Sequence, residues 1–315
     1  MHDVMRPVRT RLRRYARVLP PSLRRDLENY LHRARKAQAS RTAVGARTQD
    51  PAYWLLLPGW LAQRGVGAHK RPQRVLGDVL WGQYCLYLAI RIKDDLFDQQ
   101  ARSKNLSIVA DGFMAESRRA FEKYFEERSS FWSGYQRCIE TTNAAIRQID
   151  ALQRADTTSA SQLLREYAKQ SAVFKVGSLA ICKMSGRPGI FARISRFADH
   201  VAIASQIVDD LQDITEDLKQ KRLNYAARVV LQNAKTVPQG GSTILKRIAG
   251  GFLYGDGLQT IFGEVRSRLR LAGEALGSLR LPESSAYLRS YNAVLNVLEQ
   301  HLHRERVQWV FGREA

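Results

Sequence analysis

One stretch, residues 205–217, constrains the fold of this 315-residue chain more than any other. Its apolar residues recur at a spacing of three to four, which is typical of one face of an α-helix. Asp209, Asp213 and Asp217 occupy every fourth position, so their carboxylates line one side of that helix. Like charges at this spacing repel by about 0.2–0.5 kcal/mol per pair. A helix selected for stability alone would carry Lys or Arg among them, so we expect something to neutralise these carboxylates.

A second acidic cluster lies upstream. Asp94, Asp95 and Asp98 follow an apolar helical run over residues 84–90, and Asp94 precedes Asp209 by 115 positions. Two clusters that each end an apolar helix can face each other across a pocket. Mg²⁺ binds through a few carboxylates together with substrate phosphate oxygens. The pattern therefore predicts a site where Mg²⁺ binds a diphosphate; the alternative is that both clusters are solvated acidic faces of surface helices.

The two clusters resemble the aspartate-rich motifs of the class I isoprenoid synthases. Asp94-Asp95-x-x-Asp98 is similar to the first motif, and the segment from Gln206 to Asp217 is similar to the second motif of trans-prenyl diphosphate synthases. The ligand register of terpene cyclases also fits positions 209, 213 and 217. The resemblance covers residues 70–230. It implies an all-α, single-domain helical bundle around a central pocket.

The resemblance also implies roles for the acidic residues. It implies about three Mg²⁺ ions. Their expected ligands are Asp94, Asp98, Asp209, Asp213 and Asp217. Asp95 and Asp210 are expected to support these ligands, and the expected catalytic residues are Asp94, Asp95, Asp98, Asp209, Asp210 and Asp213.

Basic and aromatic residues are expected to bind the substrate. The segment that contains Phe174 and Lys175 resembles a family segment whose lysine reaches the diphosphate, and Lys219, Lys221 and Arg222 follow the second motif. Aromatic rings one to three turns from the aspartates suit a pocket that holds a hydrocarbon chain and stabilises a carbocation. Ordinary core packing is the alternative for these rings. The expected substrate-binding residues are Arg91, Lys175, Lys219, Lys221, Arg222, Trp81, Tyr84, Tyr87, Phe174 and Gln206.

The fate of the carbocation divides two functions. After Asp98 the prenyltransferases carry an Arg-Arg-Gly stretch, which this chain lacks, and the loop at residues 65–72 departs from their second-substrate loop. These departures favour a Mg²⁺-dependent terpene synthase that ionises an allylic prenyl diphosphate and cyclises or rearranges the carbocation. The alternative is a prenyl diphosphate synthase, chain-elongating or head-to-head, in which Lys70, Arg71 and Arg102 rebuild the second anion site.

The rest of the chain reads as helices. The apolar spacing and the capping residues predict long helices, with no strand-like alternation and no Gly-rich nucleotide loop. The expected ranges are residues 23–39, 73–99, 106–127, 130–154, 160–184, 191–219, 256–280 and 282–310.

Charge and cysteine content bear on partners and compartment. The net charge is +20, and residues 1–47 hold 13 Lys and Arg against 3 Asp and Glu. We expect residues 1–47 to form a basic arm and helix, and residues 48–315 to form the all-α domain. The arm suits peripheral contact with an anionic membrane. The alternative is a solubilising tail that binds nothing specific. No secretory signal, membrane span or zinc or redox cysteine spacing is expected, so we expect a cytoplasmic protein, membrane-peripheral if the arm binds lipid.

Two further functions are alternatives to these, and each implies different partners. One alternative is a non-catalytic subunit of a prenyltransferase, although such subunits tend to lose one motif and both are present here. The other is a basic nucleic-acid-binding helical protein, but the acidic clusters argue against that surface, so no nucleic-acid partner is expected. The expected partners are a prenyl diphosphate substrate and, from the resemblance, a second copy in a homodimer.

Overall fold

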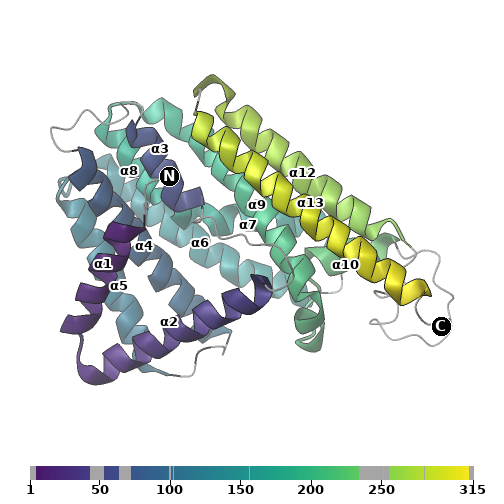
Figure 1. Ribbon diagram of the computed structural model, residues 1–315. Helices are drawn as coiled ribbons and strands as arrows, with labels where there is room; N and C mark the ends of the chain where they lie inside the picture. Colours follow the sequence, from purple (N-terminus) through teal and green to yellow (C-terminus); the bar gives the residue numbers. More distant parts are fainter. Residues whose placement is uncertain are drawn as a thin grey trace. The chain divides into compact units, whose positions relative to one another are not determined.

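A computed structural model describes residues 5–42, 53–63, 72–98, 101, 103–155, 157–233, 248, 251, 255–279 and 281–311. Every regular element in these ranges is helical, which confirms the all-α prediction (Figure 1). The α-helices are α1 (Arg6–Val18), α2 (Pro21–Thr42), α3 (Tyr53–Gln63), α4 (Pro72–Phe97), α5 (Asn105–Glu122), α6 (Ser130–Arg154), α7 (Ala160–Gln170), α8 (Val176–Met184), α9 (Pro188–Lys219), α10 (Tyr225–Asn233), α12 (Gly257–Leu276) and α13 (Pro282–Phe311). Two short 3₁₀ helices are η1 (Ser171–Lys175) and η2 (Gly277–Leu279).

None of the described helices is both long and apolar enough to cross a membrane.

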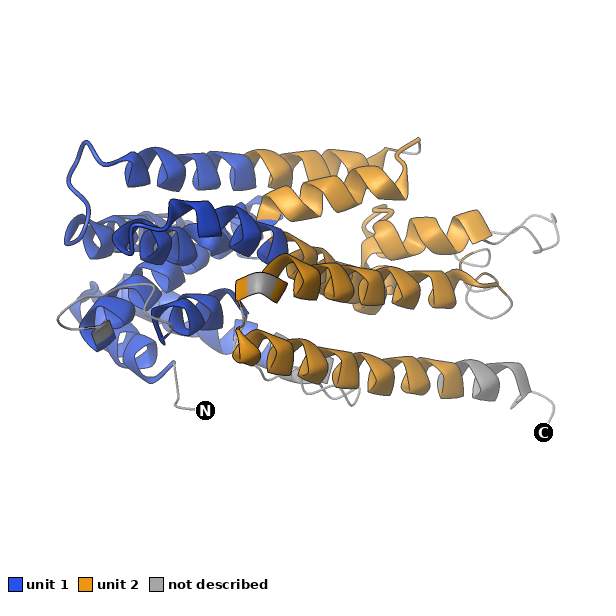
Figure 2. Ribbon diagram, turned by 90° about the horizontal axis from the view of Figure 1, so that it is seen from above, with its two compact units in different colours: residues 1–40, 49–143, 171–198 blue, residues 41–48, 144–170, 199–315 orange. Residues whose placement is uncertain are grey.

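The chain forms two compact units (Figure 2). Unit 1 comprises Met1–Ser40, Gln49–Asn143 and Ser171–Ala198, and unit 2 comprises Arg41–Thr48, Ala144–Gln170 and Asp199–Ala315. The first aspartate motif therefore belongs to unit 1 and the second to unit 2. The expected division at residue 47 stays a prediction.

Helix α4 is the central element of unit 1. It packs against α5, α1, α3 and α8. Gly82 on α4 allows the close approach of α5, because a Cβ atom there would lie 2.7 Å from Cε2 of Phe121. Phe113, Phe121 and Phe131 are fully buried in this unit. The apolar residues that mark α4 in the sequence are therefore core residues on several sides of the helix.

The basic N-terminal helices are part of unit 1. Val8 and Leu12 of α1 are buried, and Tyr15 packs on Phe113 with ring centroids 4.8 Å apart. Arg11 forms an ion pair with the buried Asp78 of α4 at 2.5 Å. Helix α1 thus packs one face into the unit and leaves most of its arginines exposed.

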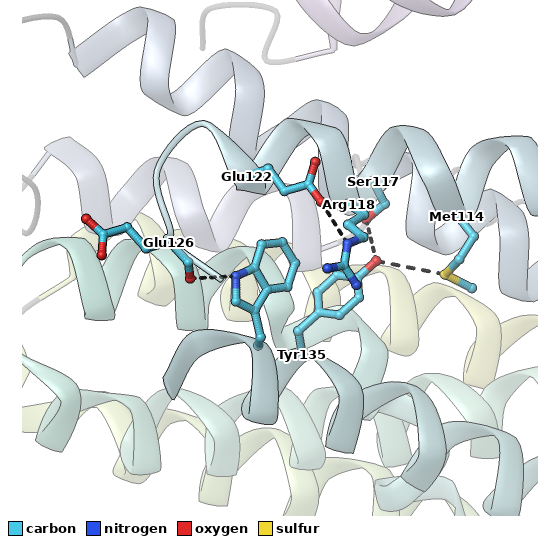
Figure 3. A network of polar contacts seen from close by, with 7 residues as sticks. Met114, Ser117, Arg118, Glu122, Glu126 and Tyr135 are labelled. Carbon is cyan, nitrogen blue, oxygen red and sulfur yellow. Dashed lines mark hydrogen bonds and ion pairs between the residues drawn. The ribbon is translucent and has the colours of Figure 1, made fainter. Parts of the chain in front are cut away.

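A polar network joins α5 to α6 at the turn between them (Figure 3). The hydroxyl of Tyr135 lies 3.0 Å from Oγ of Ser117 and 3.8 Å from Sδ of Met114. Arg118 pairs with Glu122 at 2.7 Å, and its guanidinium lies 5.0 Å from the ring centroid of Trp132. This network belongs to unit 1 and includes none of the predicted site residues.

The helix expected over residues 160–184 is interrupted. Residues 171–175 form the 3₁₀ helix η1, and the buried side chain of Gln83 bridges the interruption. Its Nε2 donates to the carbonyl of Val173 at 3.0 Å, and its Oε1 accepts from the amide of Gly177 at 2.6 Å. The amide of Val173 donates to Oγ1 of Thr142 at 3.0 Å. Side chains thus satisfy buried backbone groups that a continuous helix would pair internally.

Unit 2 contains α7, α10, α12 and α13 with the adjoining parts of α6 and α9. Helix α12 packs against α10 and α13, and α10 packs against α7. Arg228 of α10 is buried, and its guanidinium donates to four backbone carbonyls at 2.7–2.9 Å. The acceptors are the carbonyls of Leu223, Thr158, Leu152 and Ala155. One buried cation therefore satisfies the carbonyl end of α6 and the loops beside it.

Candidate functional site

The first aspartate motif lies at the C-terminal end of α4. Asp94 and Asp95 occupy the last turn, and the amide of Asp98 donates to the carbonyl of Asp94 at 2.9 Å. Adjacent helical residues point about 100° apart. Asp95 is accordingly 9% exposed, whereas Asp94 and Asp98 are half-buried. The motif therefore combines one buried carboxylate with two that reach the surface.

Two side chains hold the buried Asp95. The hydroxyl of Tyr30, from α2, donates to Oδ2 at 2.7 Å, and Nε of Arg91 pairs with Oδ1 at 3.1 Å. Burial raises the pKa of the Tyr30 hydroxyl, and Asp95 raises it further by hydrogen bonding and charge. Burial alone would lower the pKa of Arg91, but the charge of Asp95, together with those of Tyr87, Asp94 and Tyr30, outweighs that effect and raises it. Arg91, a predicted substrate-binding residue, is thus already paired with an aspartate of its own helix.

The second aspartate motif lies in the C-terminal half of α9. Asp210 is 3% exposed, Asp209 is exposed, and Asp213 and Asp217 are half-buried. Within this motif, too, the second aspartate of an adjacent pair turns into its unit. The helix predicted from the carboxylate spacing, residues 191–219, is observed as Pro188–Lys219.

Three groups donate hydrogen bonds to the carboxylate of Asp210. Its Oδ2 accepts from the hydroxyl of Tyr167 at 2.5 Å and from the amide of Tyr225 at 2.9 Å. Its Oδ1 accepts from Nε2 of Gln206 at 3.0 Å. Burial raises the pKa of Asp210 to about 7, even though these hydrogen bonds favour the ionised form. Gln206, a predicted substrate-binding residue, is therefore engaged in holding Asp210.

Asn224 joins the second motif to α10. Its Nδ2 donates to Oδ2 of Asp217 at 2.6 Å and to the carbonyl of Asp210 at 2.8 Å. Its Oδ1 accepts from the amide of Ala227 at 2.9 Å, as an N-cap does. Asn224 is not among the predicted site residues, although asparagine directly before a helix is a recognised start signal.

The basic residues after the second motif differ in their surroundings. Lys219 is exposed and lies 3.9 Å from Glu216, and Lys221 is exposed with a left-handed φ of 59° where the chain leaves α9. Arg222 pairs with Asp150 of α6 at 3.1 Å. The two lysines thus lie on the surface of unit 2, and Arg222 joins α6 to the turn after α9.

The predicted aromatic residues separate into two groups in unit 1. Tyr84, Tyr87 and Phe174 gather around Trp54 of α3, whose ring centroid lies 4.8 Å from that of Tyr87 and 5.4 Å from that of Phe174. Trp81 instead lies 6.3 Å from Tyr15 of α1. Lys175 is buried at the end of η1, directly after Phe174. Trp54 is the member of this aromatic cluster that the predicted set lacks.

The donor set suits Mg²⁺ by chemistry. All five predicted ligands are carboxylates, the hard oxygen donors that Mg²⁺ prefers. Within the described ranges, no three His, Cys, Asp or Glu side chains are grouped closely enough to hold a metal ion. The roles assigned to these residues stay predictions, and Lys70, Arg71 and Arg102 lie outside the described residues.

Comparison with known proteins places the fold. No family model matches this chain, and no curated protein matches its sequence. A geranylgeranyl pyrophosphate synthetase from Geoglobus acetivorans is 12% identical and superposes with a TM-score of 0.61 over 96% of this chain and 99% of its own. A decaprenyl diphosphate synthase from Rhodobacter capsulatus is 16% identical, with a TM-score of 0.62 over 96% of each chain. A polyprenyl synthase from Roseobacter denitrificans is 14% identical, with a TM-score of 0.60 over 90% of this chain and 98% of its own. The chain therefore has the all-α fold of the class I isoprenoid synthases.

Proposed function

We propose that this protein is a Mg²⁺-dependent prenyl diphosphate synthase that joins an allylic prenyl diphosphate to a second prenyl diphosphate. The observation that carries the proposal is the pair of aspartate motifs, each set on a helix of this fold with its second aspartate buried. The three solved structures compared above are named as a geranylgeranyl pyrophosphate synthetase, a polyprenyl synthase and a decaprenyl diphosphate synthase, and they match 90–96% of this chain.

This proposal departs from the terpene synthase favoured by the sequence. That preference depended on departures from the prenyltransferase pattern at residues 65–72 and 99–102. Nearly all of these residues lie outside the described ranges, so the structure adds nothing to that argument. The fold comparisons favour the alternative, a prenyltransferase.

Two groups of residues would bind the two parts of the substrate, its diphosphate and its hydrocarbon chain. Asp94, Asp98, Asp209, Asp213 and Asp217 would hold about three Mg²⁺ ions. When bound, Mg²⁺ stabilises the negative charge of the departing diphosphate. Aromatic faces attract a carbocation, so the cluster around Trp54 is suited to line the apolar part of the substrate site.

Product analysis tests the proposal. The purified protein would be incubated with geranyl, farnesyl or geranylgeranyl diphosphate, with and without isopentenyl diphosphate, in Mg²⁺ or in a chelator. We expect longer prenyl diphosphates only when both substrates and Mg²⁺ are present. A cyclic hydrocarbon or alcohol formed from one substrate alone would instead establish the terpene synthase.

Matched aspartate variants connect the activity to the motifs. Asp94→Asn and Asp213→Asn should each lower turnover by at least about 100-fold, because each removes a predicted metal ligand. Asp111→Asn is the control, since Asp111 lies on α5, is exposed and pairs only at the surface with Lys93. Equal activity in all three variants would place the chemistry away from the two motifs, and no activity in the wild type would support the non-catalytic subunit.

Contact with a membrane and formation of a homodimer are further proposals. Five arginines of α1 are exposed, which supports contact of the basic segment with an anionic membrane. They are Arg6, Arg9, Arg13, Arg14 and Arg17. Sedimentation with vesicles of anionic or neutral lipid would test this contact, and analytical ultracentrifugation would test the homodimer. Salt-dependent DNA binding would instead support the nucleic-acid alternative.

A further inference from the structure

The second aspartate of each motif shares two kinds of contact, one with the residue four positions earlier and one with a tyrosine of a different helix. In α4, Oδ1 of Asp95 pairs with the residue four positions earlier, Arg91, and Oδ2 accepts from a tyrosine of a different helix, Tyr30. Both carboxylate oxygens are therefore engaged by side chains.

The same two contacts recur at the two carboxylate oxygens of Asp210 in α9. Oδ1 of Asp210 accepts from the residue four positions earlier, Gln206, and Oδ2 accepts from a tyrosine of a different helix, Tyr167. The two arrangements lie in different units and use helices that are unrelated in sequence position. The shared feature is a buried tyrosine hydroxyl that donates to a buried carboxylate.

These contacts restrict how each helix is rotated about its own axis. The hydroxyl and the carboxyl group of each pair are largely withdrawn from water, so leaving either of them without its partner is costly. Once Asp95 or Asp210 is fixed, the adjacent Asp94 or Asp209 points about 100° away around the same helix. Asp209 is exposed and Asp94 half-buried, so in each pair the first aspartate is the more accessible.

We propose that Tyr30 and Tyr167 are positioning residues for the metal ligands. Each fixes the buried second aspartate of a pair and so sets the direction of the accessible aspartates that would bind Mg²⁺. The proposal depends on the proposed function for the identity of the metal. It also assigns a task to the basic segment, because Tyr30 belongs to α2 and anchors that helix to the first motif.

Tyrosine-to-phenylalanine variants test the contribution of each hydroxyl group alone. Tyr30→Phe and Tyr167→Phe remove one oxygen and keep the packed ring. Tyr135→Phe is the matched control, because its hydroxyl is also buried and hydrogen-bonded, to Ser117, in a network that includes no residue of either motif (Figure 3). A general cost of losing a buried hydroxyl should therefore appear equally in all three variants.

The first readout is Mn²⁺ binding in the presence of inorganic pyrophosphate, followed by electron paramagnetic resonance. We expect Tyr30→Phe and Tyr167→Phe each to weaken Mn²⁺ affinity by about 10–100-fold, as loss of a group that orients a ligand does. Tyr135→Phe should bind as the wild type does. In Tyr30→Phe/Asp95→Asn, the affinity should fall no further than in the weaker-binding single variant, because both changes break one arrangement.

The second readout needs no metal. Hydrogen exchange in the metal-free protein should quicken over residues 92–98 in Tyr30→Phe and over residues 207–213 in Tyr167→Phe, and in neither stretch in Tyr135→Phe.

The outcomes separate the two proposals. Wild-type Mn²⁺ binding that neither tyrosine variant alters would overturn the inference and leave the proposed function standing. A wild type that binds no Mn²⁺, with exchange that quickens locally as expected, would refute the proposed function and leave Tyr30 and Tyr167 only the task of holding Asp95 and Asp210 in place. Unchanged exchange in both variants would overturn the inference outright.

Discussion

Asp78 gives the sharpest test of how the basic N-terminal segment is held. Its carboxylate is 2% exposed and pairs with Arg11 of α1 at 2.5 Å. It also accepts from Lys123 at 3.2 Å and from the hydroxyl of Tyr124 at 2.6 Å, both in the turn after α5. We predict that Asp78→Asn destabilises the protein, because an amide of the same shape removes the charge that three donors share.

The contacts set the size of the effect. Breaking a fully buried ion pair costs about 3–5 kcal/mol. Here the Arg11 and Lys123 side chains are 32% and 51% exposed, so water compensates part of the loss. The Tyr124 hydrogen bond adds about 1 kcal/mol. We therefore expect the free energy of unfolding to fall by about 2–3 kcal/mol.

The sign of the pH dependence follows from the same groups. Burial raises the pKa of Asp78, but the hydrogen bonds from Tyr124, Arg11 and Lys123 and the charge of Arg11 together outweigh it and hold the pKa below its ordinary range. A lowered pKa in the folded protein stabilises it above the pKa of the unfolded chain, and this stabilisation is lost as the pH falls through the folded value. The difference between wild type and Asp78→Asn should therefore shrink below about pH 4.

Urea unfolding near neutral pH and in acid measures both effects. Asp111→Asn is the control, since Asp111 and Lys93 are 67% and 44% exposed, and it should change stability by no more than about 0.5 kcal/mol. The reasoning would be refuted by equal losses in the two variants, or by an Asp78→Asn loss that stays constant as the pH falls.

Three substitutions test packing and backbone satisfaction. Gly82→Ala should destabilise by about 1–3 kcal/mol, because its Cβ would lie 2.7 Å from the Phe121 ring; an unchanged melting temperature would contradict the tight α4–α5 contact. Gly263→Ala in α12, with open space around its Cβ, should stabilise by up to about 1 kcal/mol in the same thermal assay; a loss would disprove the open space. Arg228→Met should cost at least about 3 kcal/mol in urea unfolding, because it deprives several carbonyls of their donor; a loss under about 1 kcal/mol would show that water replaces it.

The helices that carry the motifs were predictable from local pattern. Apolar spacing placed the first motif in a helix over residues 73–99, which is observed as Pro72–Phe97. The all-α class followed from the same spacing, because helical periodicity depends only on neighbours within a turn or two.

Contacts made across long sequence separations were not predictable in this way. The interruption of the helix at η1 depends on Gln83, which lies about 90 positions away and matches no local signal. Tyr30 and Tyr167 are 65 and 43 positions from the aspartates they hold. Arg222, expected to bind diphosphate, pairs with Asp150 of α6. The sequence located the charged groups, but only the tertiary structure assigns their partners.

Asp78 anchors α1 in unit 1 and Arg228 anchors α10 in unit 2, and these two anchors differ in how they respond to acid. The Asp78 anchor of unit 1 needs an ionised carboxylate, so protonation detaches it from Arg11 of α1. The Arg228 anchor of unit 2 joins a guanidinium to neutral carbonyls, and neither partner changes its charge on acidification. Acid should therefore release α1 while the junction of α6 with α10 persists. The protein would then denature in stages, through an intermediate in which α6 and α10 remain joined.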